Sequence, residues 1–269
     1  MGDSVDKNVP LTYPDMRCLA EHAASCFPDR EFFLCADEEM PYVRGSELFG
    51  FCKKAAAVLD AVPAGRHIAL LGPGSAAWLA AYFAVLSAGR VIVPLHDGMQ
   101  PQELEDCLRL SDCEMLLCDE RRGETAAALA RSLPGLRVLP LHAFLTKLRA
   151  EKRETLPELC ADSTAAMFFT SGTTGKPRCV MLTHRNMGSE ISAVTEVLSL
   201  SENDVGLSLL PLSHTFEMMT HVAGALHCGG TLYLNESVRT VKKNLRASLP
   251  NLRPSVPADI RALPSEASG

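Results

Sequence analysis

The chain has 269 residues, of which 47% are hydrophobic and 22% charged, a composition typical of a folded protein rather than a disordered one. Its 26 Lys and Arg residues against 32 Asp and Glu residues give a formal net charge of −6. This balance disfavours a dedicated nucleic-acid or anionic-membrane binder, because phosphates collect on basic surfaces, although a local basic site for one nucleotide remains compatible with it. The length suits one large domain or two small ones.

The ten cysteines form no Cys-x-x-Cys pair and no zinc-finger spacing with histidine, and most of them lie beside apolar residues. We interpret them as buried, reduced thiols of a cytoplasmic protein. The N-terminus lacks the basic-then-apolar pattern of a signal peptide, and Asp6 stands where a myristoylation signal has Ser or Thr. The longest apolar stretch, residues 76–88, is too short to cross a bilayer, so we expect no transmembrane segment.

Short apolar runs alternate with helical patterns along the chain. The predicted strands cover residues 32–35, 67–71, 91–95, 115–118, 137–139, 165–169, 180–182, 205–210 and 231–234. The predicted helices cover residues 46–59, 76–87, 101–111, 124–133, 184–198 and 216–227. Pro101 suits the first turn of its helix, and Thr183 is the expected N-cap of the helix that follows it.

The β-α-β order of the first 139 residues predicts an α/β fold with doubly wound, mainly parallel sheets, right-handed crossovers and helices on both faces. The strands are continuously apolar, as expected for a sheet that is covered on both sides. Ligands of such sheets bind beyond the carboxyl ends of the strands. The charged stretch 149–154 is interpreted as a solvated connector, after which a second unit begins at Ala165.

The strongest local signal is the segment 170–178, Thr-Ser-Gly-Thr-Thr-Gly-Lys-Pro-Arg, which follows an apolar strand. Glycines let a backbone approach an anion closely, and successive N–H groups and hydroxyls can surround phosphate oxygens. The spacing is not that of a Walker P-loop, because only Thr173 and Thr174 separate Gly172 from Gly175. From these residues alone, a surface hairpin rich in turn-forming residues remains an alternative to a phosphate site.

Residues 170–186 resemble the phosphate-binding signature of AMP-forming adenylating enzymes, the superfamily of acyl-CoA synthetases, peptide-synthetase adenylation domains and luciferases. Residues 209–217, Leu-Leu-Pro-Leu-Ser-His-Thr-Phe-Glu, resemble the family's Pro-Leu-x-His segment in its long-chain fatty acyl-CoA ligase form. Residues 87–95 also resemble the family's early Ala-Gly-x-x-x-x-Pro stretch. The resemblance covers about residues 10–235, and with its motifs in order it favours the phosphate site over the simple hairpin.

The resemblance implies ATP-dependent activation of a carboxylic acid, expected to be a fatty acid. The carboxylate attacks the α-phosphate, which gives an acyl-adenylate and pyrophosphate, and a thiol, usually that of coenzyme A, then displaces AMP. ATP, Mg²⁺ and coenzyme A are the implied cofactors. One alternative is adenylation of an amino or aryl acid with transfer to a carrier-protein thiol. Another is a non-catalytic nucleotide-binding remnant or partner subunit.

The resemblance also implies roles for individual residues. The implied ATP-phosphate-binding residues are Thr170, Ser171, Gly172, Thr173, Thr174, Gly175, Lys176 and Arg178. Thr170 is in addition the implied Mg²⁺ ligand. His214 is the implied catalytic residue at the acid pocket, with a hydrogen-bonded structural histidine as the alternative. Arg178 and Cys179 replace the family's usual Lys-Gly. The positive charge is therefore kept on a guanidinium instead of an ammonium group, and Cys179 adds a side chain beside the loop.

Other residues receive plainer interpretations. His184 is expected to cap or pack at a helix start, Trp78 to lie in the core, and His96 and His221 have no supporting pattern. The cations at 242–246 are expected to form a solvated face.

The later motifs of the family are absent: a Tyr-Gly-x-Thr-Glu segment, an Asp for the ribose, and a small C-terminal domain with a catalytic Lys. No tyrosine follows Tyr233, and residues 249–269 contain four prolines that disfavour regular structure. We expect residues 1–235 to be the N-terminal portion of an adenylation domain. Residues 236–269 are expected to be a divergent, Pro-rich tail from truncation or a frameshift. The chain is then expected to lack full activity alone, or to be completed by a separate C-terminal chain.

Overall fold

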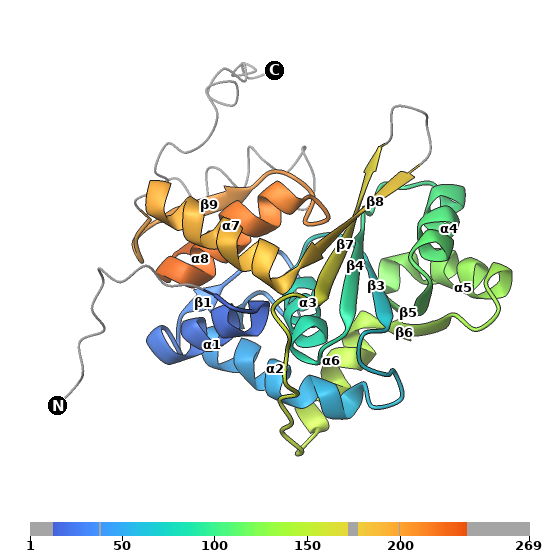
Figure 1. Cartoon of the computed structure of the whole chain (residues 1–269), viewed down its shortest axis with the longest axis horizontal. Helices are drawn as coiled ribbons and strands as arrows, with labels where there is room; N and C mark the ends of the chain where they lie inside the picture. Colours follow the sequence, from blue (N-terminus) through green and yellow to red (C-terminus); the bar gives the residue numbers. More distant parts are fainter. Residues whose placement is uncertain (1–12, 38, 172–176, 199, 236–269) are drawn as a thin grey trace, which may run out of the picture.

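A central six-stranded sheet organises the computed structural model, which describes residues 13–37, 39–171, 177–198 and 200–235 (Figure 1). The strand order is β6-β5-β3-β4-β7-β8. The strands are β3 (His67–Leu71), β4 (Val91–Leu95), β5 (Cys113–Cys118), β6 (Arg137–Pro140), β7 (Thr164–Ser171) and β8 (Pro177–Thr183). All neighbouring strands run parallel except β7 and β8, which are antiparallel, so the predicted mainly parallel sheet is confirmed.

Helices cover both faces of this sheet, as predicted (Figure 1). One face packs on α3 (Ala76–Ser87) and α6 (Leu141–Ala150), and α1 (Met16–Cys26) and α2 (Gly45–Val58) pack on these helices in the same core cluster. The other face packs on α4 (Pro101–Leu110) and α5 (Gly123–Ser132). Ile68 and Leu70 point to the first face, whereas Ala69 and Leu71 point to the second. The continuous apolar runs therefore have the expected cause, a sheet buried on two sides.

The helix α3 is buried along its whole length, and its ends match the predicted ones. Ser75 caps its start by accepting a hydrogen bond from the Trp78 backbone (3.1 Å), and Gly89 follows its end with a positive φ of 70°. Trp78 is 1% exposed, which confirms its place in the core. None of the helices in the described ranges is long and apolar enough to cross a membrane.

A smaller layer follows the central sheet in sequence. It contains the parallel pair β9 (Val205–Ser208) and β10 (Thr231–Leu234), with α7 (His184–Val197), η2 (Glu217–Val222) and α8 (Ala223–Cys228). The element η2 is a π-helix, so the single helix predicted over residues 216–227 is in fact a π-helical turn that continues as an α-helix.

The predicted second unit does not begin at Ala165. Its first strand, β7, joins the first sheet, where Ala166 pairs in parallel with Ile92. The stretch after α6 is exposed, as predicted, but it is tied to α2: the Thr155 N–H donates to the Lys53 carbonyl (2.7 Å). The charged segment therefore connects two parts of one sheet, not two units.

Several elements differ from the sequence prediction. The helices α1 and α6 were not predicted, and the strand expected over residues 32–35 is the short β1 (Glu31–Phe32), paired with β2 (Val43–Arg44). Phe33 has a φ of 60°, a left-handed conformation that ends β1.

The cysteines are less uniformly buried than predicted. All ten are free, but only Cys52, Cys107 and Cys118 are buried, and three are exposed. Cys179 is one of the exposed ones because it lies on β8, at the edge of the sheet.

Two imidazoles hold the N-terminal end of α1. The Tyr13 hydroxyl hydrogen-bonds to Nδ1 of His227 (2.7 Å), and the Met16 N–H donates to Nδ1 of His184 (3.3 Å). Burial lowers the pKa of both histidines, and a charge on the stacked ring of His22 lowers the pKa of His227 further. His184 thus packs at the start of α7, as predicted, and both rings are neutral in the fold.

This arrangement predicts that the free energy of unfolding falls in mild acid. Since the folded-state pKa is depressed, the unfolded chain takes up protons first, so the stability is fully present above about pH 6.5 and is lost below it. His227→Gln is expected to flatten the decrease between about pH 7.5 and about pH 5.5, measured by urea denaturation with the fluorescence of the single tryptophan. His142→Gln, at an exposed pair with Glu39, is the matched control. An unchanged slope in His227→Gln would contradict this account.

Candidate active site at the carboxyl edge of the sheet

The topology creates a switch point between β3 and β4. The helix that follows β3, α3, packs on one face of the sheet, and the helix that follows β4, α4, packs on the other. The loops after these two adjacent strands therefore diverge, which is where open α/β sheets bind ligands. Residues 72–75 and 96–99 form these loops.

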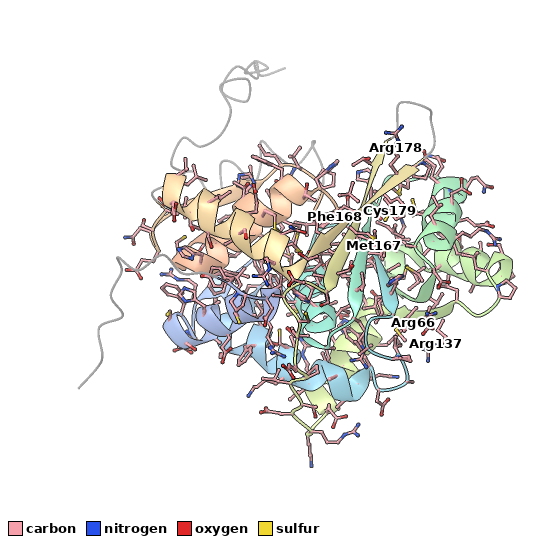
Figure 2. The ribbon with its side chains drawn as sticks, viewed as in Figure 1. Arg66, Arg137, Met167, Phe168, Arg178 and Cys179 are labelled. Atoms are coloured by element: carbon pink, nitrogen blue, oxygen red, sulfur yellow. The ribbon has the colours of Figure 1, made fainter. Side chains whose placement is uncertain are left out.

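The predicted phosphate segment lies at the same edge. The pairing of Ile92 with Ala166 fixes the register of β7 against β4. His96 and Thr170 each lie four residues beyond this pair, so they lie at the same height of the sheet. Thr170 lies opposite Arg178 on β8, and Ser171 lies opposite Pro177. Figure 2 shows Arg178 far along the β7–β8 hairpin, away from Arg66 and Arg137 at the other end of the sheet.

The described part of the phosphate segment is thus a surface hairpin, and Thr170 and Arg178 are both exposed. The two interpretations of this segment, a surface hairpin and a phosphate site, are compatible, because a ligand can reach the exposed ends of the two strands. The remaining predicted phosphate residues, Gly172, Thr173, Thr174, Gly175 and Lys176, lie outside the described residues, as do the cations at 242–246.

The far end of the hairpin is fixed by the predicted cap of α7. The Thr183 hydroxyl accepts a hydrogen bond from the Asn186 N–H, and the Asn186 side chain accepts one from the Thr183 N–H (both 3.1 Å). This capping box confirms Thr183 as the N-cap and anchors β8 to the second layer.

The segment after β9 covers the switch point. Leu212 packs against Gly74 so closely that a Cβ at position 74 would lie 3.2 Å from its Cδ1 atom. The rings of His214 and His96 lie 6.3 Å apart, centroid to centroid, at an angle of 59°. The sequence segment predicted to form the acid pocket therefore meets the loops after β3 and β4.

His214 is held through its backbone. Its N–H donates to the Pro211 carbonyl (2.9 Å), and its own carbonyl accepts from the Met218 N–H (3.2 Å). The side chain is exposed, and its ring forms no hydrogen bond to any residue that the structure describes. Both interpretations of His214, the acid-pocket residue and the structural histidine, stay predictions.

His96 is a site residue that the sequence analysis missed. Its Nδ1 accepts a hydrogen bond from the Gly98 N–H (3.1 Å). Burial lowers the pKa of His96, as do charges on His214 and Arg122, whereas Asp97 and Glu103 act in the opposite direction. The ring is therefore neutral near pH 7, with its proton on Nε2. Its position directly after a buried parallel strand was the signal that could have revealed it.

A second missed feature is the Glu217–His221 pair on the π-helical turn. Glu217 is fully buried, and its Oε2 lies 3.0 Å from Nδ1 of His221. Its Oε1 has no hydrogen-bond partner among the described residues. The His221 ring contacts Phe216 edge-on at 5.9 Å, and Phe216 is 59% exposed beside the His214 segment. π-Helical turns occur often at functional sites, which adds this pair to the candidate site.

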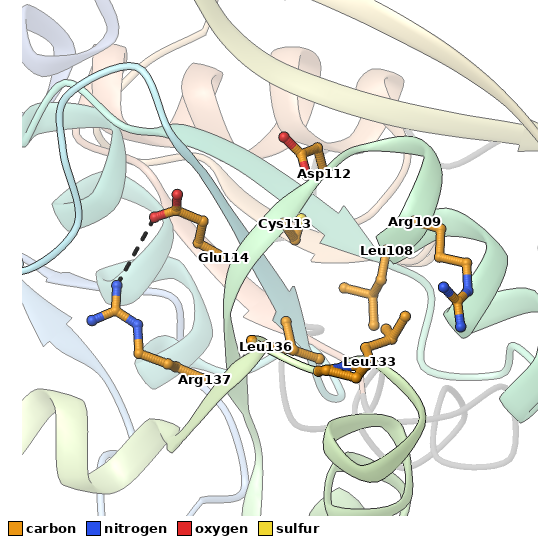
Figure 3. Close-up of a pocket in the computed structure, with 10 residues that line it drawn as sticks. Leu108, Arg109, Asp112, Cys113, Glu114, Leu133, Leu136 and Arg137 are labelled. Carbon is orange, nitrogen blue, oxygen red and sulfur yellow. Dashed lines mark ion pairs between the residues drawn. The ribbon is translucent and has the colours of Figure 1, made fainter.

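A cavity of about 570 Å³ lies elsewhere, at the amino ends of β5 and β6 (Figure 3). Leu108, Leu133 and Leu136 contribute its apolar wall. Arg137 and Glu114 form an ion pair of 4.0 Å at its rim. Because parallel sheets bind ligands at the opposite edge, this cavity is not the candidate site. The described residues also contain no group of three or more side chains arranged to hold a metal ion.

The sequence matches the AMP-binding enzyme family over residues 20–267. The chain belongs to this family. The match includes residues 236–267, which the sequence analysis set apart as a divergent tail and which lie outside the described residues.

Two relatives and one solved structure of similar fold illustrate the similarity. The long-chain-fatty-acid–CoA ligase 1 of Cavia porcellus is 26% identical over an alignment of 223 positions that covers 71% of this chain and 32% of that protein. A feruloyl-CoA synthase of Amycolatopsis sp. is 31% identical over 173 residues, 64% of this chain and 34% of that protein. The structure of the Klebsiella oxytoca NpsA N-terminal subdomain in complex with 3-hydroxybenzoyl-AMSN has a TM-score of 0.72 at 21% identity, and covers 88% of this chain and 58% of that one. The chain spans less than half of the length of the curated relatives that it matches.

The Glu217–His221 pair predicts a specific stability effect. His221→Leu removes the described donor to a buried carboxylate, so the free energy of unfolding is expected to fall by about 1–3 kcal/mol in urea denaturation near neutral pH. His221→Gln, which keeps a donor, should lose less. The double variant Glu217→Leu with His221→Leu should recover stability relative to His221→Leu, because no unpaired carboxylate remains. Equal urea midpoints for the parent chain and His221→Leu would contradict this role.

Proposed function

We propose that the carboxyl edge of the sheet binds ATP and a carboxylic acid for the formation of an acyl-adenylate. The observation that carries the proposal is the convergence of four separate segments there. The β7–β8 hairpin ends beside the loop after β4, and the His214 segment packs over the loop after β3. Membership of the AMP-binding enzyme family supports the same chemistry.

In this proposal the hairpin supplies the groups that neutralise phosphate. The proposed groups are the hydroxyls of Thr170 and Ser171 at the end of β7, the segment from Gly172 to Lys176, which lies outside the described residues, and the guanidinium of Arg178 on β8. Charge-assisted hydrogen bonds of this type are worth about 1.5–3 kcal/mol each. They act as negative charge develops on the departing pyrophosphate, while a carboxylate oxygen forms its bond to the α-phosphorus and the α–β phosphoanhydride bond breaks.

The Thr170 hydroxyl is the proposed protein ligand of Mg²⁺. A single hydroxyl suits this ion, because Mg²⁺ commonly keeps several waters and takes its other oxygens from the substrate phosphates. Thr170 is exposed at the end of β7, directly opposite Arg178. When bound, the ion would add positive charge at the phosphates and hold their orientation.

A fatty acid is the proposed substrate, and coenzyme A the proposed thiol acceptor. The Pro-Leu-Ser-His segment of residues 211–214 and the naming of one relative as a long-chain-fatty-acid–CoA ligase support this choice. The exposed side chains of Leu210 (45%) and Phe216 (59%) flank His214 and could contact an alkyl chain. The feruloyl-CoA synthase among the relatives makes an aromatic acid the competing candidate.

The part of the reaction assigned to residues 1–235, as the N-terminal portion of an adenylation domain, is the binding of ATP and acid. We also propose that complete turnover requires a separate C-terminal chain, and that the protein is cytoplasmic. Tests on this chain are therefore best designed around binding.

The ATP site can be tested by isothermal titration of the full chain with Mg-ATP. Arg178→Ala is expected to weaken binding by about 10-fold or more, because one charge-assisted contact is lost. Arg137→Ala is the control, since it removes the same charge at the opposite edge of the sheet. A parent chain that takes up no Mg-ATP would contradict the proposed function, and equal losses in both variants would contradict the placement of the site.

The acid class can be tested with two non-hydrolysable acyl-adenylate analogues, one dodecanoyl and one feruloyl. The dodecanoyl analogue is expected to bind about 10-fold more tightly, because a buried alkyl chain contributes about 0.8 kcal/mol per CH₂ group where the site can cover it. Titration of both analogues into the same protein sample makes the comparison direct. Tighter binding of the feruloyl analogue would assign the site to an aromatic acid instead.

A further inference from the structure

The loop after β4 holds one imidazole in a fixed chemical form. The Gly98 N–H donates to Nδ1 of His96 (3.1 Å), so Nδ1 is an acceptor and the ring proton belongs on Nε2. In the described residues Nε2 has no hydrogen-bond partner, which leaves one N–H donor open. The half-buried ring stays uncharged near neutral pH because desolvation and the neighbouring cations disfavour its protonation.

The ring position depends on a glycine. A Cβ at position 98 would lie 2.6 Å from Cε1 and 3.0 Å from Nδ1 of His96, so any larger residue there must displace the ring. The turn itself is closed by the Met99 N–H, which donates to the His96 carbonyl (3.1 Å). The backbone of one short loop therefore determines the position of the His96 ring and its tautomer, with the proton on Nε2.

The surroundings of this donor are those of the candidate site. His96 follows β4 at the level of Thr170 on β7, and its ring faces the exposed ring of His214 at 6.3 Å. The charged groups around it are Asp97 and Arg122, which pair with each other at 2.7 Å, and Glu103 from α4. No carboxylate among the described residues accepts a hydrogen bond from the ring, so its open donor is free for an oxygen of a ligand.

We propose that His96 is a binding residue for the reacting acid, whose carboxylate or acyl-phosphate oxygen accepts a hydrogen bond from its Nε2–H. The inference rests on the proposed function, since it assigns one more contact to the same acyl-adenylate. A neutral donor suits this place, because it can bind an anionic ligand oxygen but forms no ion pair with the nearby carboxylates of Asp97 and Glu103. In this division the hairpin cations hold the phosphates, and the two histidines hold the acyl end.

The test is isothermal titration of the full chain with a non-hydrolysable dodecanoyl-adenylate analogue and, separately, with Mg-ATP. His96→Leu removes the donor and is expected to weaken binding of the analogue by about 10-fold. Gly98→Ala leaves His96 chemically intact but displaces its ring, so it should weaken the analogue similarly. His96→Gln keeps an N–H donor of similar reach and should stay within about threefold of the parent chain. Affinity for Mg-ATP should change by less than about threefold throughout, because the hairpin is unaltered.

His142→Leu is the matched control, since it removes an imidazole from the first turn of α6, which follows β6 at the same edge of the sheet. Thermal melting checks that each variant is folded, and if His96→Leu is not, Gly98→Ala and His96→Gln decide the question. Parent-like affinity of the analogue for both Gly98→Ala and His96→Leu would overturn the inference and leave the proposed function standing. Loss of Mg-ATP and analogue binding in the parent chain itself would overturn both.

Discussion

The parallel pairing of β4 with β7 is the constraint on which the candidate site depends. It brings together two segments that are more than seventy residues apart in sequence, the loop that begins at His96 and the end of β7 at Thr170. The core fixes its register, because Ile92 and Ala166 are both fully buried and a shift of one residue would exchange the two faces of β7. The packing of apolar side chains thus sets the level at which the polar site residues meet.

Burial also determines which side chains of the candidate site are charged. Close to the core, at the end of β4, desolvation keeps His96 neutral, and its Nδ1 accepts a hydrogen bond from the Gly98 N–H, which leaves the ring proton on Nε2. Farther out, on the hairpin, the Arg178 side chain is exposed, so its guanidinium stays in contact with water. The two proposals use this difference in burial, with exposed cations for the phosphates on the hairpin and one uncharged donor, His96, for the acid nearer the core. Glu217, fully buried beside His221, is the exception: its Oε1 has no hydrogen-bond partner within the described part of the chain, and it lies on the π-helical turn that follows the His214 segment.

Local signals in the sequence predicted the elements that local interactions determine. Helix α3 has its predicted ends because Ser75 caps one and Gly89 terminates the other, and Thr183 caps α7 as its hydroxyl suggested. The missed helix α6 carried a readable signal too, since its buried residues recur at helical spacing: Leu141, Phe144, Leu145 and Leu148. The pairing of β7 with β4 and the meeting of His96 with His214 could not be read in this way, because tertiary packing rather than neighbouring residues determines them.

Hydrogen–deuterium exchange of the full chain with and without Mg-ATP and an acyl-adenylate analogue would test most directly whether the carboxyl edge is the site. The account predicts slower exchange at the amides of residues 96–99, 168–171 and 212–218 when either ligand is present, with unchanged exchange around the cavity at residues 112–114 and 133–137. Protection confined to that cavity, or no protection anywhere at saturating ligand, would contradict it.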